Sequence, residues 1–353
     1  ISDYTRTFNS NNLTISPNGS EKIGGVAADV TLNVNGQALT LVYVDGNEGW
    51  INVQNAEDTE TGVPDAYIVA TGGTITTVCT DYKVHTFTGP GTFCVSAGSG
   101  ALAKVDYLVV AGAGGGGGSY PNYYSGGGGG AGGYRESPGT TSGSYTVSPL
   151  GTSPAVALPV STTGYPVTVG AGGSGGPASP RCRGCSGSNS VFAGTTTITS
   201  AGGGYGGRSG GDPAQNGTQG GGGGSGGGTG GYTASPQAPG GTGNNPPVNP
   251  PQGNPGGAGT VPSSGQGGGG GGATASGTAG GSGHGAAGGA GATSSINGSP
   301  TTRSVGGDGG EPTGSPTAGG ANTGNGGTSG HNSPLAGAAG GSGIVIIRYK
   351  FQN

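Results

Sequence analysis

Apolar and polar residues alternate with a period of two over the first part of the chain. The alternation covers 13–15, 29–34, 38–44 and 50–53, and this period is typical of half-buried β-strands. Asn35-Gly36 separates the second and third segments and is a strong signal for a two-residue hairpin turn. We therefore predict an all-β N-terminal module over residues 1–72, in which the polar, acidic segment 54–65 is a linker.

Strand patterns continue beyond the module and return at the end of the chain. Segment 84–93 has the pattern of a hairpin around a Gly-Pro-Gly turn, and the apolar segment 105–111 leads directly into glycine. Residues 73–111 are thus expected to be strands that lead into a glycine-rich domain. Further strands are predicted over 165–169, 191–199 and 344–351, the last of which closes the chain.

Glycine accounts for 94 of 353 residues, and most of it lies after residue 111. Uninterrupted runs occupy 114–118, 126–130, 220–224 and 267–272. They do not keep the Gly-X-Y period of collagen. The alternatives are disorder, which is the default for Gly/Ser-rich chains, and a lattice of extended helices with three residues per turn, bonded to one another through their backbones. Because strands flank the region, we expect residues 112–353 to form a polyglycine II sandwich with essentially no α-helix.

Irregular segments rich in Pro, Tyr, Asn and Arg interrupt the glycine blocks. If the blocks are packed helices, these segments are the turns between them, and turns on a rigid scaffold commonly carry binding sites. They are 119–125, 134–163, 177–190, 212–218, 232–255, 291–305 and 328–336. Tyrosine is favoured at recognition surfaces. The candidate receptor-binding residues are Tyr120, Tyr123, Tyr124, Tyr134, Tyr145 and Tyr232. The alternative is that these tyrosines cover the faces of glycine layers.

Charge and motif content exclude several function classes. The net charge is −4, and a few scattered arginines in the glycine region make no basic patch for nucleic acid. No apolar stretch reaches the ~20 residues of a membrane span. His85 lies near Asp81 and Thr86, but strand alternation explains this proximity, and no Gly-Lys-Ser/Thr motif follows the glycines. We expect no enzymatic activity, no cofactor and no metal, and the absence of methionine indicates a processed or partial chain.

The cysteines form two close pairs, which are candidate disulfides. Cys79 and Cys94 lie on neighbouring strand-like segments, and Cys182 and Cys185 form a CxxC motif. For the CxxC, a local disulfide, free thiols and a metal or redox role all remain open, although a structural zinc site needs four ligands. The pairs favour an oxidising, extracellular setting.

The order of these motifs resembles a known family. Val105–Gly112 running into polyglycine, Tyr165–Gly170, and Gly341–Tyr349 at the end are similar to glycine-rich domains of marine and cyanobacterial phage structural proteins. The alternation with irregular segments resembles the tail-fibre tip adhesins of T-even-like phages. Segments 11–20 and 41–51 resemble β modules that precede such tips, although in those adhesins the tip is usually separate from the fibre shaft.

The resemblance implies a polyglycine II sandwich whose loops bind a host receptor, either a glycan or an outer-membrane protein. It also implies a homotrimer on the virion surface, attached to other fibre proteins through residues 1–72. The alternative is a structural subunit of an extracellular filament or virion fibre without a specific ligand. An ice-binding protein is a third class, against which the long irregular segments argue.

Overall fold

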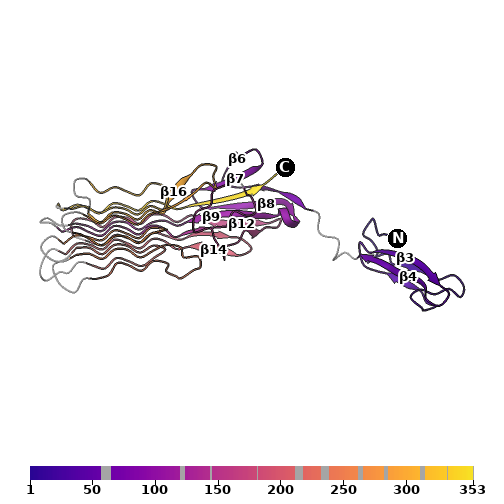
Figure 1. The fold of residues 1–353 in the computed structure, drawn as a ribbon. Coiled ribbons are helices and arrows are strands. Elements are labelled where there is room, and N and C mark those ends of the chain that lie inside the picture. The colour runs from indigo at the N-terminus through magenta and orange to yellow at the C-terminus, as the bar shows by residue number, and fades with distance from the viewer. Residues whose placement is uncertain are drawn as a thin grey trace. The chain divides into compact units, whose positions relative to one another are not determined.

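The chain divides into two compact units, Ile1–Asp65 and Ala66–Asn353 (Figure 1). The computed structural model describes residues 1–56, 65–119, 124–143, 145–180, 182–210, 218–231, 238–260, 265–281, 285–310, 315–331 and 333–352. Over these ranges there are β-strands, one short 3-10 turn at Gly100–Leu102 and no α-helix, which confirms the predicted all-β fold. The first unit is shorter than the predicted 1–72, because β5 (Ala66–Thr71) pairs with β8 (Gly91–Ser99) of the second unit.

The first unit consists of two small antiparallel sheets. In one, β1 (Leu13–Ile15) pairs with β2 (Val30–Leu32). In the other, β3 (Ala38–Asp45) pairs with β4 (Gly49–Ala56). Gly36 has a left-handed φ of 76° and does form a turn. The predicted hairpin across it is nevertheless wrong, because β2 pairs back with β1 and β3 pairs forward with β4.

Two larger sheets form the base of the second unit. The first has the order β10-β9-β17-β7-β6, with β11 also paired to β9, and the second has the order β14-β13-β12-β8-β5. Their bounds are β6 (Thr74–Val78), β7 (Tyr82–Phe87), β9 (Lys104–Val110), β10 (Tyr134–Glu136), β11 (Leu158–Pro159), β12 (Gly164–Thr168), β13 (Ser190–Ala193), β14 (Thr197–Ser200) and β17 (Ile344–Lys350). A separate hairpin joins β15 (Ala292–Ser294) to β16 (Thr301–Arg303).

The main hydrophobic core combines residues of both sheets, including Phe93, Phe192 and Tyr349. A second cluster includes Leu108, Ile296 and Ile346. Alternate residues of β9 and of β17 belong to the two clusters, so both strands are buried on both faces. Strands buried on both faces have continuous apolar sequences, which explains the uninterrupted apolar stretch of the closing strand.

The predicted hairpin over 84–93 is wrong. β7 pairs with β17 and β6, whereas β8 pairs with β12 and β5 in the other sheet. Segment 88–90 therefore carries the chain from one sheet to the other instead of joining paired neighbours.

Beyond the sheets, the glycine runs pack as a lattice held by backbone hydrogen bonds (Figure 1). The run 111–119 shows the rule, because its N–H groups donate in strict rotation to three neighbouring runs. Ala111 donates to Gly133, Gly112 to Ser188 and Ala113 to Gly341, each at 3.0 Å, and the cycle repeats with Gly114, Gly115 and Gly116. A rotation every three residues is that of a helix with three residues per turn, which makes no hydrogen bonds within itself.

The same run also accepts from three further runs. Gly173 donates to Ala113 at 2.8 Å, Gly203 to Gly112 at 2.9 Å and Gly327 to Gly114 at 3.0 Å. The run 111–119 is thus surrounded, and its backbone polar groups find partners on every side. The run 125–133 has the same environment, since it donates to the runs that contain Gly207, Gly268 and Gly327. These two central runs confirm the predicted polyglycine II packing.

Candidate functional site

The helices end together at one end of the lattice, opposite the sheets. Ser119 donates its backbone N–H to Leu335 at 3.0 Å, and Ser125 donates to Gly265 at 3.1 Å. Gly231 donates to Ser125 at 2.9 Å, and Gly210 donates to Gly231 at 2.8 Å. We call the end marked by these residues the turn end. The described runs on either side of 120–123, 211–217 and 232–237 are antiparallel, as the bonds Gly117 to Gly127, Gly221 to Tyr205 and Gly241 to Gly227 show. The ends of these runs therefore lie on one surface.

Two serine side chains fix the turn end. The Ser125 hydroxyl accepts from the Gly267 N–H at 2.6 Å, and the Ser119 hydroxyl donates to the Ser333 carbonyl at 2.8 Å. Both serines are fully buried. A buried hydroxyl with partners on other runs holds these runs in register, so the turns start from fixed positions.

The predicted turns divide between the two ends of the lattice. Segments 134–163 and 291–305 lie against the sheets, because they contain β10 with β11 and the β15–β16 hairpin. Segment 177–190 is largely not a turn. Its residues 182–189 form a helical run, in which Cys182 and Cys185 accept from Gly118 and Gly115 of the central run.

The six candidate tyrosines fall into three groups. Tyr120, Tyr123 and Tyr232 lie outside the described residues, so their placement stays a prediction. Tyr124 is half-buried and directly precedes Ser125, which places it at the turn end. Tyr134 and Tyr145 lie in the segment against the sheets instead.

The interpretation of Tyr134 and Tyr145 as receptor-binding residues is wrong. Tyr134 is only 1% exposed, belongs to the second core cluster and donates its hydroxyl to Glu136 at 2.9 Å. Tyr145 packs against the same cluster, with its ring 5.0 Å from the buried guanidinium of Arg348. An apolar ring with a buried polar partner serves the core as well as it serves an interface, so sequence alone did not separate the two roles.

A buried polar network surrounds Tyr134. The Glu136 carboxylate accepts from the Ser294 hydroxyl at 2.5 Å and from the Ser148 N–H at 3.1 Å, as well as from Tyr134. Burial raises the pKa of Glu136, while its hydrogen bonds oppose the shift. Burial disfavours the charged form of nearby Arg303 as well, and for a cation this lowers the pKa. The network joins β10 to the β15–β16 hairpin and is enclosed in protein, which makes it a structural element.

His85 is also a core residue. Its Nδ1 lies 2.7 Å from the Gly72 carbonyl, and its Nε2 lies 3.1 Å from the Tyr349 hydroxyl. A carbonyl only accepts, so Nδ1 carries the proton and the neutral Nε2 accepts from Tyr349. Burial lowers the pKa of His85, and the charge of Lys83 acts in the same direction. The imidazole is fully buried, so it has no exposed face for a substrate.

The predicted disulfides are wrong in both pairs. All four cysteines are free and exposed. Cys79 follows β6 in one sheet and Cys94 lies on β8 in the other, so they are not on neighbouring strands. Cys182 and Cys185 are one turn apart on a three-residue helix, or about 9 Å, whereas a disulfide allows at most about 7 Å between Cα atoms.

The structure contains a surface patch near the CxxC that the sequence does not predict. The Arg183 guanidinium lies 4.4 Å from the ring centroid of Tyr205 and donates to its hydroxyl at 2.8 Å. The ring covers a glycine layer, because a Cβ at Gly221 would lie 2.6 Å from it. Tyr205 therefore covers the face of a glycine layer, which is the alternative role proposed for the tyrosines from the sequence. The sequence feature that distinguishes this role is position: Tyr205 lies inside a glycine run, whereas the candidate receptor-binding tyrosines lie between runs.

Within the described ranges, no group of three or more His, Cys, Asp or Glu side chains is arranged to hold a metal ion. In the same parts of the chain, no helix has the length and apolar character needed to cross a membrane.

Comparison with known proteins identifies a family for the second unit. Residues 86–350 match a family model described as a glycine-rich domain. The match begins within β7 and ends at the last residue of β17, so it covers most of the sheets and the whole lattice of the second unit. No curated protein matches the chain.

Proposed function

We propose that this chain, which belongs to the glycine-rich domain family, is a phage tail-fibre or fibre-tip adhesin, as the resemblance of its motifs to such proteins implies. In this proposal the polyglycine lattice is a scaffold, and the connections at the turn end bind a receptor on the host cell surface. The receptor is a glycan or an outer-membrane protein, and the protein acts outside the cell on the virion. The first unit joins copies of the chain, as a trimer, to the rest of the fibre.

The observation that carries the proposal is the gathering of several chain reversals at one end of a backbone-bonded lattice. Ser125, Gly210, Gly231 and Gly265 are linked by backbone hydrogen bonds, and Ser119, which ends the neighbouring antiparallel run, bonds to Leu335. The described residues that flank these connections are held by the lattice, and binding sites commonly lie on loops carried by a rigid scaffold. Tyr124 supplies an aromatic side chain at this end, and aromatic anchors commonly dominate binding energy.

The lattice constrains the amino-acid sequence of those connections very little. Its bonds run from backbone to backbone between runs, so residues between the runs can change without removing them. A surface that must match a particular receptor benefits from this freedom. A filament subunit without a ligand would not need it.

Adsorption of the purified protein to a panel of intact bacterial cells tests the proposal. The test variant replaces Tyr120, Tyr123 and Tyr124 together with alanine. The matched control is Val156→Ala, which removes an exposed side chain from the segment against the sheets. We expect the triple variant to lose attachment with an unchanged melting temperature, while the control binds like the wild type.

Two outcomes would contradict the adhesin proposal. The first is a wild type that attaches to no strain of a broad panel, and the second is a turn end at which every connection can be replaced without loss of attachment. Either result would favour the structural subunit of a filament.

A further inference from the structure

The first unit exposes more large apolar side chains than it buries. Among its described residues, the buried hydrophobic ones are Leu32 and Leu39. The exposed ones are Ile1, Tyr4, Val26, Val42, Tyr43, Val44 and Val53. A unit of this size buries too little surface to be very stable alone, and exposed apolar side chains can then be covered by a partner. The excess of exposed over buried apolar side chains in the first unit indicates that a protein partner covers part of its surface.

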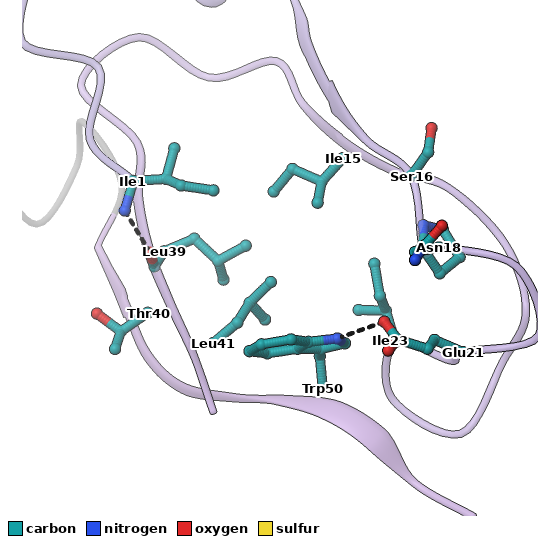
Figure 2. Close-up of a pocket in the computed structure, with 11 residues that line it drawn as sticks. Ile1, Ile15, Ser16, Asn18, Glu21, Ile23, Leu39, Thr40, Leu41 and Trp50 are labelled. Atoms are coloured by element: carbon teal, nitrogen blue, oxygen red, sulfur yellow. Dashed lines mark hydrogen bonds between the residues drawn. The ribbon is translucent and has the colours of Figure 1, made fainter. Parts of the chain in front are cut away.

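An apolar pocket of about 470 Å³ opens in this unit (Figure 2). Its walls are aliphatic, and the indole of Trp50 forms one side. The aliphatic residues are Ile1, Ile15, Ile23, Leu39 and Leu41. The Trp50 indole N–H donates to the Glu21 carboxylate at 3.1 Å. The pocket therefore offers mainly carbon surface, with Ser16, Asn18 and Thr40 as further polar lining.

The volume suits an aromatic side chain. Small-molecule pockets span about 300–1,000 Å³, so this one lies towards the small end of that range. The lining combines aliphatic carbon and one indole with a few polar groups at Ser16, Asn18, Glu21 and Thr40. It matches a ring whose polar tip can reach the hydroxyl and amide groups of Ser16 and Asn18.

The same unit carries such a ring in an exposed and rigid position. Tyr4 is 94% exposed. The preceding residue, Asp3, is 4% exposed, and its carboxylate accepts from the N–H groups of Thr7 at 3.0 Å, Phe8 at 2.8 Å and Gly36 at 3.1 Å. The turn that bears Tyr4 is thus fixed by a buried carboxylate, and an anchor held in place in advance loses little entropy when it binds.

We propose that Tyr4 of one copy of this chain inserts into the Trp50 pocket of a second copy. The pocket and Tyr4 are different patches of one unit, so the contact is either exchanged within a two-fold pair or closed into a ring of copies. The inference rests on the part of the proposed function in which the first unit joins copies of the chain, and it holds whether or not the turn end binds a receptor. It assigns residues to an association that the sequence only suggested.

Trp50 gives a direct readout, because it is the only tryptophan in the chain. Sedimentation velocity and tryptophan emission of the full chain are measured over a concentration series from micromolar upwards. We expect a concentration-dependent oligomer, with emission that shifts to the blue as Tyr4 covers the indole. Tyr4→Ala should weaken association at least about thirtyfold, the scale of an aromatic hot spot. The matched control Val156→Ala, an exposed apolar side chain of the other unit, should associate like the wild type.

A photo-crosslinking amino acid at position 4 protects the test against variants that fold poorly. In a mixture of isotopically light and heavy chains, crosslinks should join position 4 of one copy to Ile15, Leu41 or Trp50 of another. Crosslinks that map outside the pocket would overturn the proposal, as would an oligomer that Tyr4→Ala leaves intact. A wild type that stays monomeric also overturns it. If Trp50 emission in that monomer responds to a small apolar probe, the pocket belongs to a small ligand instead.

Discussion

At the residue scale, two buried polar side chains of the second unit, Asp106 and His85, are held by hydrogen bonds to partners from other segments. The Asp106 carboxylate accepts from the hydroxyl of Ser137 at 2.8 Å and from the N–H of Ser142 at 2.7 Å. His85 is held between the Gly72 carbonyl and the Tyr349 hydroxyl. Sequence patterns placed these residues on strands but gave no sign of their partners, which come from distant segments. Single tyrosines were hardest to interpret for the same reason, since Tyr134 and Tyr124 have the same chemistry in different places.

His85 should make the second unit sensitive to mild acid. Its pKa is lowered by burial from the usual 6.5, so between the folded and unfolded values the unfolded chain binds more protons. The free energy of unfolding that neutral His85 contributes is fully present above about pH 6.5. It is lost as the pH falls towards the folded pKa, with a slope of at most about 1.4 kcal/mol per pH unit. His85→Gln should flatten this part of the profile. Denaturant unfolding of both proteins between pH 7.5 and 5 measures the difference, and parallel profiles would contradict the assignment.

At the scale of the element, a polyglycine helix needs glycine only where it faces a neighbour. On the run 182–189, Gly184 and Gly187 face the central run, because a Cβ at either would collide with the carbonyl of Gly115 or Gly112. The exposed row of the same run carries Cys182 and Cys185. This explains why the sequence of 177–190 resembles a turn, whereas uninterrupted runs such as 126–130 indicate helices. A glycine period of three was the signal that would have identified the outer helix.

Substitutions within the lattice should follow the environment of each glycine. A Cβ at Gly128 would collide with the Gly307 backbone carbonyl, whereas one at Gly222 meets the Thr242 hydroxyl at 2.7 Å, a side chain that can move. We expect Gly128→Val to destabilise the fold by about 2–4 kcal/mol and Gly222→Leu to cost less.

Gly281 provides the control for this series. Nothing lies within 4 Å of a Cβ built there, and its φ is not left-handed. Gly281→Ala should be neutral or stabilise by up to about 1 kcal/mol, because alanine restricts the unfolded chain. Thermal melts of the three variants test the expected order of melting temperatures, with Gly128→Val lowest, Gly222→Leu intermediate and Gly281→Ala highest. Equal melting temperatures would mean that the runs do not pack as a lattice.

At the scale of the whole molecule, the fold class was predictable but the pairing of strands was not. Alternation and glycine runs identify elements one at a time, and the all-β fold follows from them. A turn signal such as Asn35-Gly36 fixes only a local reversal. Which strands pair depends on the surface that each then buries, and for β2 the partner is β1, whereas β7 pairs with the closing strand from the far end of the chain.

The division into two units predicts two unfolding steps. Ile1–Asp65 and Ala66–Asn353 are separate compact units, and the main core clusters contain residues of the second unit alone. We expect the first unit to unfold at lower temperature, in a step that moves with protein concentration if copies associate through it. Trp50 emission follows this step, while circular dichroism follows the second unit. A single transition seen by both probes would show that the units unfold together.

The backbone lattice also bears on how stability changes with temperature. Unfolding an apolar core raises the heat capacity strongly, whereas exposing peptide groups lowers it. A lattice whose partners are N–H and C=O groups should therefore unfold with a heat-capacity increment per residue below the usual ~12–15 cal/mol/K. Its stability curve would be broad and flat, so that the second unit loses little stability near freezing, where domains held by apolar cores weaken.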